Sequence, residues 1–273
     1  MLPAVSQVCS LHAPFETDIA DYAAGACKTI ELWTGKLDSY LQQHSLTDAR
    51  RLLDEHDVKT PVASFQGGLF FEPGEAREQH WETFRTRLAQ CAPLGIETLV
   101  VANDIRGPLT ESDIERIRIS LADAAQVAQA AGVRLAFEFQ AGATLANNLE
   151  SAASLVAEIG SPHLGLCFDV YHYYTGPSKY EDLAFLSPEN LFHVQLCDLA
   201  GVARELATDA DRVLPGDGDF QLLPILDVLR QINYSGCISV ELLNPQIWQI
   251  PPRSVGEIAI TALRKLLGQA SMD

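Results

Sequence analysis

Eight short apolar or β-branched runs alternate with segments of helical spacing along the 273-residue chain, and this alternation predicts an α/β fold, a single (β/α)8 TIM barrel. Parallel strands that are covered on both faces are nearly continuous apolar runs, as these are. The rival fold, a doubly wound open sheet, carries a glycine-rich phosphate turn after its first strand. The residues after the first run, HAPFETD, contain no glycine. We therefore expect the barrel, as one domain over residues 1–273.

The expected elements follow one another in chain order. The strands are QVCSL (7–11), TIELW (29–33), VASFQ (62–66), TLVVAND (98–104), RLAFEF (134–139), LGLCFD (164–169), LFHVQLCD (191–198) and CISVELLN (237–244). Four segments of helical spacing end on glycine, a common stop signal: WETFRTRLAQCAPLG (81–95), ESDIERIRISLADAAQVAQAAG (111–132), NNLESAASLVAEIG (147–160) and FQLLPILDVLRQINYSG (220–236).

The charge and composition of the chain exclude several classes of protein. The net charge is −17 at pH 7, and an acidic surface repels phosphate backbones, so we expect no nucleic acid partner. The chain has no run of about 18 apolar residues and no basic start before an apolar run, so we expect no membrane span and no signal peptide. The six cysteines are scattered without a CxxC pair and are expected to be reduced core thiols, which makes a cytoplasmic location the expectation.

Polar residues stand at the ends of the last four expected strands, where a TIM barrel carries its chemistry. These are Glu138, Asp169, Gln195 and Glu241, with Asp198 after Gln195. Strand side chains alternate between faces, so residues of the same parity share the inward face: Ala136, Gly165, Cys167, His193, Cys237 and Ser239. The outward face then takes large apolar residues: Leu135, Phe137, Phe139, Leu166, Phe168, Val194, Leu196, Ile238, Val240 and Leu242. The four polar residues are therefore expected to point into the barrel mouth.

Three carboxylates directed at one narrow axis would repel one another, and unpaired buried charge is costly. A divalent cation removes this conflict. Carboxylate and amide oxygens suit Mg²⁺ or Mn²⁺, and Co²⁺ or Zn²⁺ could also bind. We therefore expect a divalent metal ion bound by Glu138, Asp169, Gln195 and Glu241. A second interpretation of Gln195 stays open, in which its amide only hydrogen-bonds its neighbours.

Several motifs give the chain a resemblance to a known family: FEFQ, FDVYH, VQLCD, RVLPGDGDF and ISVELLN. With these motifs the chain resembles the xylose isomerase-like TIM-barrel superfamily, in its group of sugar phosphate isomerases and epimerases, from YAAGACKTIELW to YSGCISVELLN. The resemblance implies the same four metal ligands. It also implies substrate contacts by His172 and Arg212, whose planar guanidinium suits a hydroxyl or carboxylate. The plainer alternatives are a loop hydrogen bond for His172 and a surface charge for Arg212.

One position departs from the pattern of the family. Many members carry histidine where this chain has Gln195, and glutamine there resembles some dehydroshikimate dehydratases. His193 lies two residues earlier and is expected to be a deeper, structural barrel residue. A DNA-repair endonuclease of the same superfamily binds three metal ions through extra histidines. Asp211 falls near one of its ligand positions, but Val213 stands where the next histidine belongs, so we exclude that activity.

The resemblance implies proton removal next to a carbonyl group, with Glu138 and Glu241 as acid and base. The leading hypothesis is a metal-dependent isomerase or epimerase of a ketose or related polyol. The alternatives are a lyase that dehydrates an inosose or 3-dehydroshikimate, and a non-catalytic barrel that binds a sugar or sugar acid without metal. The expected partner is a small sugar, polyol or sugar acid. The sequence leaves the oligomeric state open, a homo-oligomer included.

Overall fold

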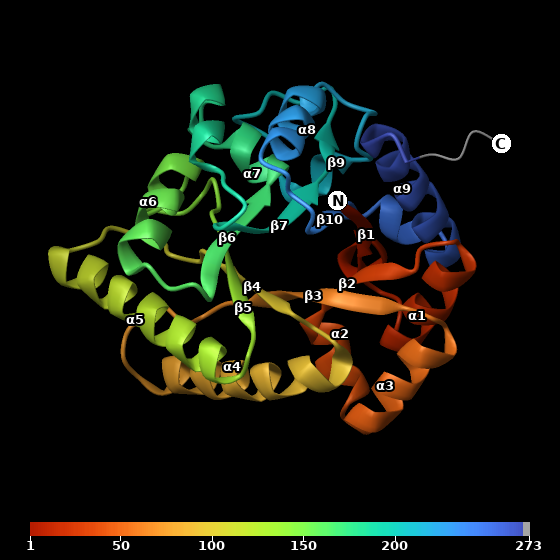
Figure 1. The fold of residues 1–273 in the computed structure, drawn as a ribbon, viewed down its shortest axis with the longest axis horizontal. Helices are drawn as coiled ribbons and strands as arrows, with labels where there is room; N and C mark the ends of the chain where they lie inside the picture. The colour runs from red at the N-terminus through yellow and green to blue at the C-terminus, as the bar shows by residue number, and fades with distance from the viewer. Residues whose placement is uncertain (270–273) are drawn as a thin grey trace.

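A closed barrel of eight parallel strands forms the centre of the protein, and helices surround it (Figure 1). The computed structural model describes residues 1–269, so the last four residues of the predicted domain lie outside the described residues. The strands are neighbours in the order β1, β10, β7, β6, β5, β4, β3, β2, and β2 closes the ring against β1. The predicted (β/α)8 barrel is confirmed.

The eight barrel strands and the helices have the following bounds. The strands are β1 (Leu2–Ser6), β2 (Thr29–Trp33), β3 (Lys59–Gln66), β4 (Thr98–Ala102), β5 (Arg134–Glu138), β6 (Leu164–Asp169), β7 (Leu191–Leu196) and β10 (Cys237–Val240). The helices are α1 (Phe15–Ala24), α2 (Thr34–Tyr40), α3 (Leu46–Glu55), α4 (Glu75–Leu94), α5 (Glu111–Ala130), α6 (Leu149–Ile159), α7 (Val170–Thr175), α8 (Leu222–Gln231) and α9 (Pro252–Leu267). The 3-10 helices η1 (Gln7–Ser10), η2 (Tyr180–Phe185), η3 (Asp209–Asp211) and η4 (Ile247–Gln249), and a small antiparallel pair, β8 (Asp198–Leu199) with β9 (Arg212–Val213), complete the described set.

The first predicted strand, residues 7–11, is wrong. The strand is β1, five residues earlier, and residues 7–10 form η1. Val8 and Cys9 are fully buried in η1, and a short buried apolar run does not reveal its secondary structure by periodicity. Pro3 is tolerated in β1 because pairing with β2 begins only at Val5, so no ladder hydrogen bond is lost on that side.

The remaining seven strands are where the sequence predicts them, but three of them end two or more residues earlier than expected. β4, β7 and β10 end at Ala102, Leu196 and Val240, and the residues after them leave the sheet to form the mouth of the barrel. Two predicted helix ends are confirmed by glycine caps in the left-handed conformation, Gly95 after α4 and Gly160 after α6.

The alternation of inward and outward side chains predicted for the strands holds, with one addition. A small cluster fills the barrel interior: Ala4, Val62, Val100, Ala136, Cys167, Phe192 and Cys237. Phe192 joins it because the β6–β7 register shifts between Leu166 and Cys167. A Cβ atom at Gly165 would lie 2.7 Å from the Phe192 ring, so glycine there makes room for that ring.

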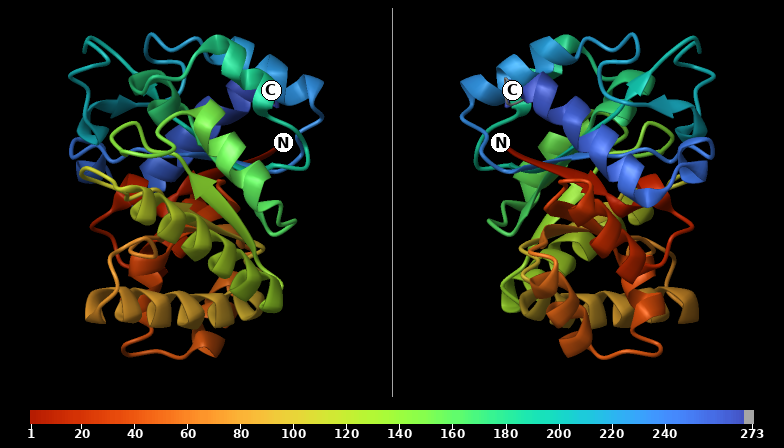
Figure 2. Two further views of the ribbon diagram at one scale, coloured as in Figure 1. Left: turned by 90° about the vertical axis from the view of Figure 1, so that its left-hand side faces the viewer. Right: turned by 90° about the vertical axis from the view of Figure 1, so that its right-hand side faces the viewer.

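A much larger apolar layer lies between the strands and the helices, and it includes predicted outward residues such as Leu135, Phe137 and Phe168. Helix α9 packs against α1, so the last helix closes the ring beside the first (Figures 1 and 2). Between residues 1 and 269 we find no helix with the length and apolar character needed to cross a membrane.

All six cysteines are free and buried, as expected for core thiols. Burial raises the pKa of every one of them, to about 12 for Cys27 and Cys91. A thiol that is both inaccessible and protonated is a poor nucleophile.

We predict that the folded protein at pH 8 reacts with a thiol reagent such as dithionitrobenzoate at least ~100-fold more slowly than the urea-unfolded protein. Six thiols should then titrate after unfolding. Absorbance of the released thiolate measures both rates. One fast thiol in the folded protein would contradict the described burial.

Candidate functional site

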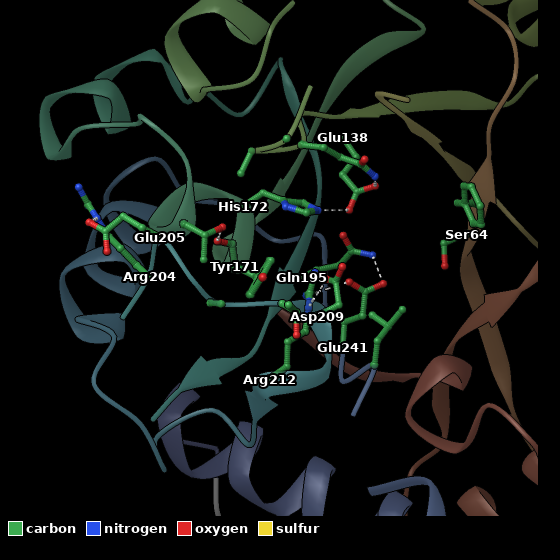
Figure 3. A pocket seen from close by; sticks show the side chains of 18 of the residues that line it. Ser64, Glu138, Tyr171, His172, Gln195, Arg204, Glu205, Asp209, Arg212 and Glu241 are labelled. Carbon is green, nitrogen blue, oxygen red and sulfur yellow. Dashed lines mark hydrogen bonds and ion pairs between the residues drawn. The ribbon is translucent and has the colours of Figure 1, made fainter. Parts of the chain in front are cut away.

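A cavity of about 630 Å³ opens at the carboxyl ends of the barrel strands (Figure 3). Residues at or just after several strand ends line it, among them Trp33, Glu138, His172, Gln195 and Glu241. The predicted site residues thus share one cavity, except for Asp169, which is fully buried with its Oδ2 atom 3.7 Å from Nε2 of the cavity residue His172.

Asp198, the other acidic residue near the end of β7, has a structural role instead. Its carboxylate accepts hydrogen bonds from the backbone N–H groups of Leu199, Gly216 and Phe220. These bonds organise the loop before α8, and Asp198 is not among the residues that line the cavity.

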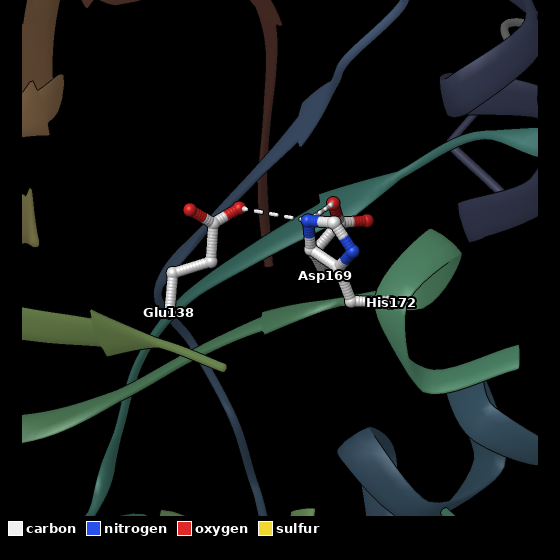
Figure 4. A group of neighbouring side chains, drawn as sticks. All are labelled: Glu138, Asp169 and His172. Atoms are coloured by element: carbon white, nitrogen blue, oxygen red, sulfur yellow. Dashed lines mark ion pairs between the residues drawn. The ribbon is translucent and has the colours of Figure 1, made fainter. Parts of the chain in front are cut away.

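Glu138, Asp169 and His172 form a compact group that could hold a metal ion (Figure 4). One ligand atom from each lies within 4.8 Å of the others. The His172 Nε2 atom is 3.9 Å from Glu138 Oε1 and 3.7 Å from Asp169 Oδ2. Asp169 ends β6 and caps α7 by accepting a 2.8 Å hydrogen bond from Tyr171 N. His172 lies three residues after Asp169, on the same side of α7, so it is a candidate metal ligand as well as the expected substrate contact.

Arg212 is a buried cation that joins two of the predicted ligands. Its guanidinium donates to Asp169 Oδ2 at 2.8 Å and to Glu241 Oε2 at 3.1 Å. It also donates twice to Asp209 Oδ1 and lies 4.3 Å from the centre of the Tyr171 ring. Only 1% of Arg212 is exposed, so the alternative of a surface charge is wrong. Most of the N–H groups of Arg212 donate to carboxylates of the protein, so the guanidinium neutralises part of the negative charge of those carboxylates.

The Gln195 amide is held by three neighbours. Its Nε2 atom donates to Glu31 Oε1 at 2.9 Å and to Glu241 Oε1 at 2.8 Å. Its Oε1 atom accepts a hydrogen bond from the weak thiol donor of Cys167, at 3.1 Å. The amide therefore hydrogen-bonds its neighbours, as one interpretation expected. A carbonyl oxygen has two lone pairs, so Oε1 can also serve a cation, as the other interpretation requires.

Glu31, on β2, is a member of the site that was not predicted from the sequence. It is fully buried, and it bonds His193 Nε2 at 3.0 Å, Ser239 Oγ and the Gln195 amide. The available signal was one acidic residue inside the apolar run TIELW. Glu31 lies in the middle of its strand, whereas the predicted site residues lie at strand ends. His193 is one layer deeper than the mouth, as expected, and its partners are Glu31 and Ser239.

The carboxyl groups of the site have strongly displaced pKa values. Burial, reinforced by the negative charge of Asp169, raises the pKa of Glu138 to about 8. Burial also raises the pKa of Glu241 well above its ordinary value, although Arg212 opposes the shift. Burial alone would raise the pKa of Glu31, but the charge and the hydrogen bond of His193 outweigh it and the pKa is lowered. Burial lowers the pKa of His172.

The donor set fits a divalent cation. The site contains four buried carboxyl groups, those of Glu31, Glu138, Asp169 and Glu241, and the Arg212 guanidinium contacts two of them, Asp169 and Glu241. When all four are ionised, their negative charge exceeds what Arg212 can balance. Carboxylate, amide and imidazole ligands suit Mn²⁺, Mg²⁺, Co²⁺ or Zn²⁺. A cation of charge +2 would relieve the repulsion that contributes to the raised pKa of Glu138.

A family profile described as xylose isomerase-like TIM barrel matches residues 19–266. The chain belongs to this family. It is 29% identical over 225 residues to the inosose isomerase of Bacillus velezensis, covering 79% of this chain and 78% of the relative. It is 26% identical over 263 residues to the 3-dehydroshikimate dehydratase of Pseudomonas aeruginosa, covering 94% of this chain but 40% of the relative. In fold, it matches the crystal structure of the IOLI protein with a bound zinc atom, with a TM-score of 0.91, 22% identity and full coverage of both chains.

Replacing Arg212 tests whether it neutralises the buried carboxylates. We predict that Arg212→Met lowers the free energy of unfolding of the metal-free protein by about 3 kcal/mol or more, because two buried acids lose their partner. Urea unfolding followed by circular dichroism measures this change. Arg230→Met is the control, since its ion pair with Asp227 is exposed and is worth about 0–1 kcal/mol. Equal losses in the two variants would contradict the prediction.

Proposed function

We propose that this protein is a divalent-metal-dependent isomerase or epimerase of a ketose or related polyol, which begins by removing the proton next to a carbonyl group. The observation that carries the proposal is a pair of buried carboxyl groups, Glu138 and Glu241, that line one cavity and have raised pKa values. The similarity to inosose isomerases supports the same class of reaction.

The two glutamates stand on different sides of the barrel mouth. Glu138 ends β5 and Glu241 follows β10, with β6 and β7 between these strands in the ring. A substrate in the cavity would therefore have a carboxyl group on either side. A carboxyl group with a pKa of about 8 can both hold and release a proton near neutral pH, which suits an acid–base catalyst. One glutamate takes the proton from carbon, and a proton is returned to the other face of that carbon or to its neighbour.

Glu138, Asp169, Gln195 and Glu241 would hold the metal ion, with His172 as a further ligand or a substrate contact. When bound, the ion supplies Lewis acidity that polarises the carbonyl group and balances the negative charge that develops on the substrate oxygens. Arg212 keeps Asp169 and Glu241 in place through its ion pairs.

Two aromatic residues give the cavity an apolar wall. The rings of Trp33 and Phe65 have their centres 4.9 Å apart, and both residues line the cavity. Such a wall suits the carbon face of a sugar or cyclic polyol, while the carboxyl and amide groups serve its oxygens.

A second candidate, a dehydratase, is favoured by three observations. Gln195 departs from the histidine of many family members, and the similarity to a 3-dehydroshikimate dehydratase covers 94% of this chain. Arg106 and Arg204 also line the cavity and suit a substrate carboxylate. In this reaction one glutamate takes the proton next to the carbonyl group, the carbon–oxygen bond of the β-hydroxyl breaks, and the other glutamate gives a proton to the leaving hydroxyl to form water.

Substrate exchange in heavy water separates these reactions. Manganese-loaded protein is incubated with a panel of ketoses, inososes and 3-dehydroshikimate, and each mixture is followed by NMR and ultraviolet absorbance. Deuterium entering a ketose or inosose, with a new isomer, supports the isomerase. An enone or protocatechuate product supports the dehydratase. Metal content below about a tenth of an equivalent after metal-rich growth, without turnover, supports the non-catalytic binder and contradicts both.

We predict that Glu241→Gln leaves the fold intact and lowers kcat by ~10³-fold or more, because an acid–base group and a metal ligand are lost together. The assay is turnover of the substrate found in the panel, with circular dichroism as the folding check. Glu257→Gln on the exposed surface of α9 is the control and should keep native activity. Activity within tenfold of native would mean that the role of Glu241 is misplaced.

A further inference from the structure

Glu31 sits at the centre of a buried hydrogen-bond network beneath the cavity. Its Oε1 atom accepts from Gln195 Nε2 at 2.9 Å, and its Oε2 atom bonds His193 Nε2 at 3.0 Å and Ser239 Oγ. Glu31, His193 and Ser239 are all fully buried, and the lining of the cavity includes none of these three. Glu31 therefore cannot contact a substrate directly. It can affect the site only through a residue that it holds and that lines the cavity, such as Gln195.

The strand register fixes the members of this network. Gln195 on β7 is paired with Ser239 on β10, and His193 is paired with Cys167 on β6. Glu31 reaches them from β2, which is not adjacent to β7 in the ring. Because a barrel core is closely packed, Glu31 has little freedom to move. His193 and Ser239 brace one of its carboxylate oxygens, and the other oxygen serves Gln195.

The carboxylate of Glu31 determines which way the Gln195 amide faces. The oxygen and nitrogen ends of an amide have nearly the same shape, so hydrogen-bond partners decide its orientation. Glu31 and Glu241 each accept one N–H group of Gln195. The reversed amide would turn its oxygen toward the Glu31 carboxylate, so that two acceptors would face each other. The nitrogen is turned to Glu241 and the oxygen to the side of the cavity that carries Glu138 and His172 (Figure 3).

We propose that Glu31, held by His193 and Ser239, is a positioning residue that locks the Gln195 amide with its oxygen toward the metal ligands. The inference rests on the proposed function, because it assigns Gln195 as an oxygen ligand of the divalent cation. Partners that orient a ligand from behind change metal affinity by about 10–100-fold when they are removed.

Metal affinity in a double-mutant cycle tests this role. The variants are Glu31→Gln, Gln195→Leu and the two together, and the readout is Mn²⁺ binding to metal-free protein by calorimetry and by electron paramagnetic resonance. The amide introduced by Glu31→Gln can donate its own N–H group to Gln195. The Gln195 amide is then free to turn over, with its oxygen away from the metal ligands. Glu31→Gln should weaken Mn²⁺ binding by about 10–100-fold. In the Gln195→Leu protein the same change should have no further effect, because the amide through which Glu31 acts is gone.

Asp18→Asn is the matched control. Asp18 is another fully buried carboxylate, bonded to Ser10 and Lys36, and it lies outside the lining of the cavity. Its replacement loses a buried acid in the same way, so it measures what general destabilisation does to Mn²⁺ binding. We expect an affinity within about twofold of native for this variant, because Asp18 and Gln195 belong to separate hydrogen-bond networks.

Each outcome decides the inference. Native Mn²⁺ affinity in Glu31→Gln, or an equal loss with and without Gln195, would overturn the positioning role while leaving the proposed function intact. Absence of Mn²⁺ binding by the native protein would overturn the proposed function and this inference with it. Should Glu31→Gln fail to fold, Ser239→Ala takes its place in the cycle. A loss of affinity that requires Gln195 supports the role, and any other result overturns it.

Discussion

The concentration of negative charge at the mouth of the barrel is the constraint on which the rest of the site depends. Carboxyl groups that are shielded from water are unfavourable unless cations or hydrogen bonds compensate them. Arg212 compensates Asp169 and Glu241, and His193 compensates Glu31. Glu138 has a distant ionic contact, 3.9 Å to His172 Nε2, and burial together with the charge of Asp169 raises its pKa to about 8. The site is therefore a preformed environment that favours a cation from outside the chain.

The closed barrel makes this arrangement possible. Parallel strands in register deliver β5, β6, β7 and β10 side chains to one mouth, while the apolar outer faces pack against helices. The side chains at the strand ends line the cavity, and polar side chains in the middle of the strands hydrogen-bond to them from below. Glu31, His193 and Ser239 form a polar layer between the apolar interior cluster and the cavity, so the polar groups at the mouth rest on other polar groups.

Local sequence was sufficient for the fold and for the placing of Glu138, Gln195 and Glu241 around one cavity, because strand alternation and the charge pattern are both local signals. Their role as metal ligands stays a prediction. Local sequence was insufficient where the answer depends on contacts between distant segments. η1 is as buried as a strand, so burial does not distinguish the two. η1 packs against β2 and η4, which are segments from other parts of the chain. Glu31 meets Gln195 across 164 positions of the chain. The direction of the Gln195 amide likewise depends on partners from two other strands.

The apolar cluster that contains Phe192 determines by which end of the barrel a substrate can reach the cavity. With Gly165 making room for its ring, Phe192 and its neighbours fill the barrel below His193, and Arg134 lies over the face of that ring. Side chains thus fill the barrel at the end opposite to the cavity. A substrate must therefore enter the cavity, and a product must leave it, at the carboxyl ends of the strands.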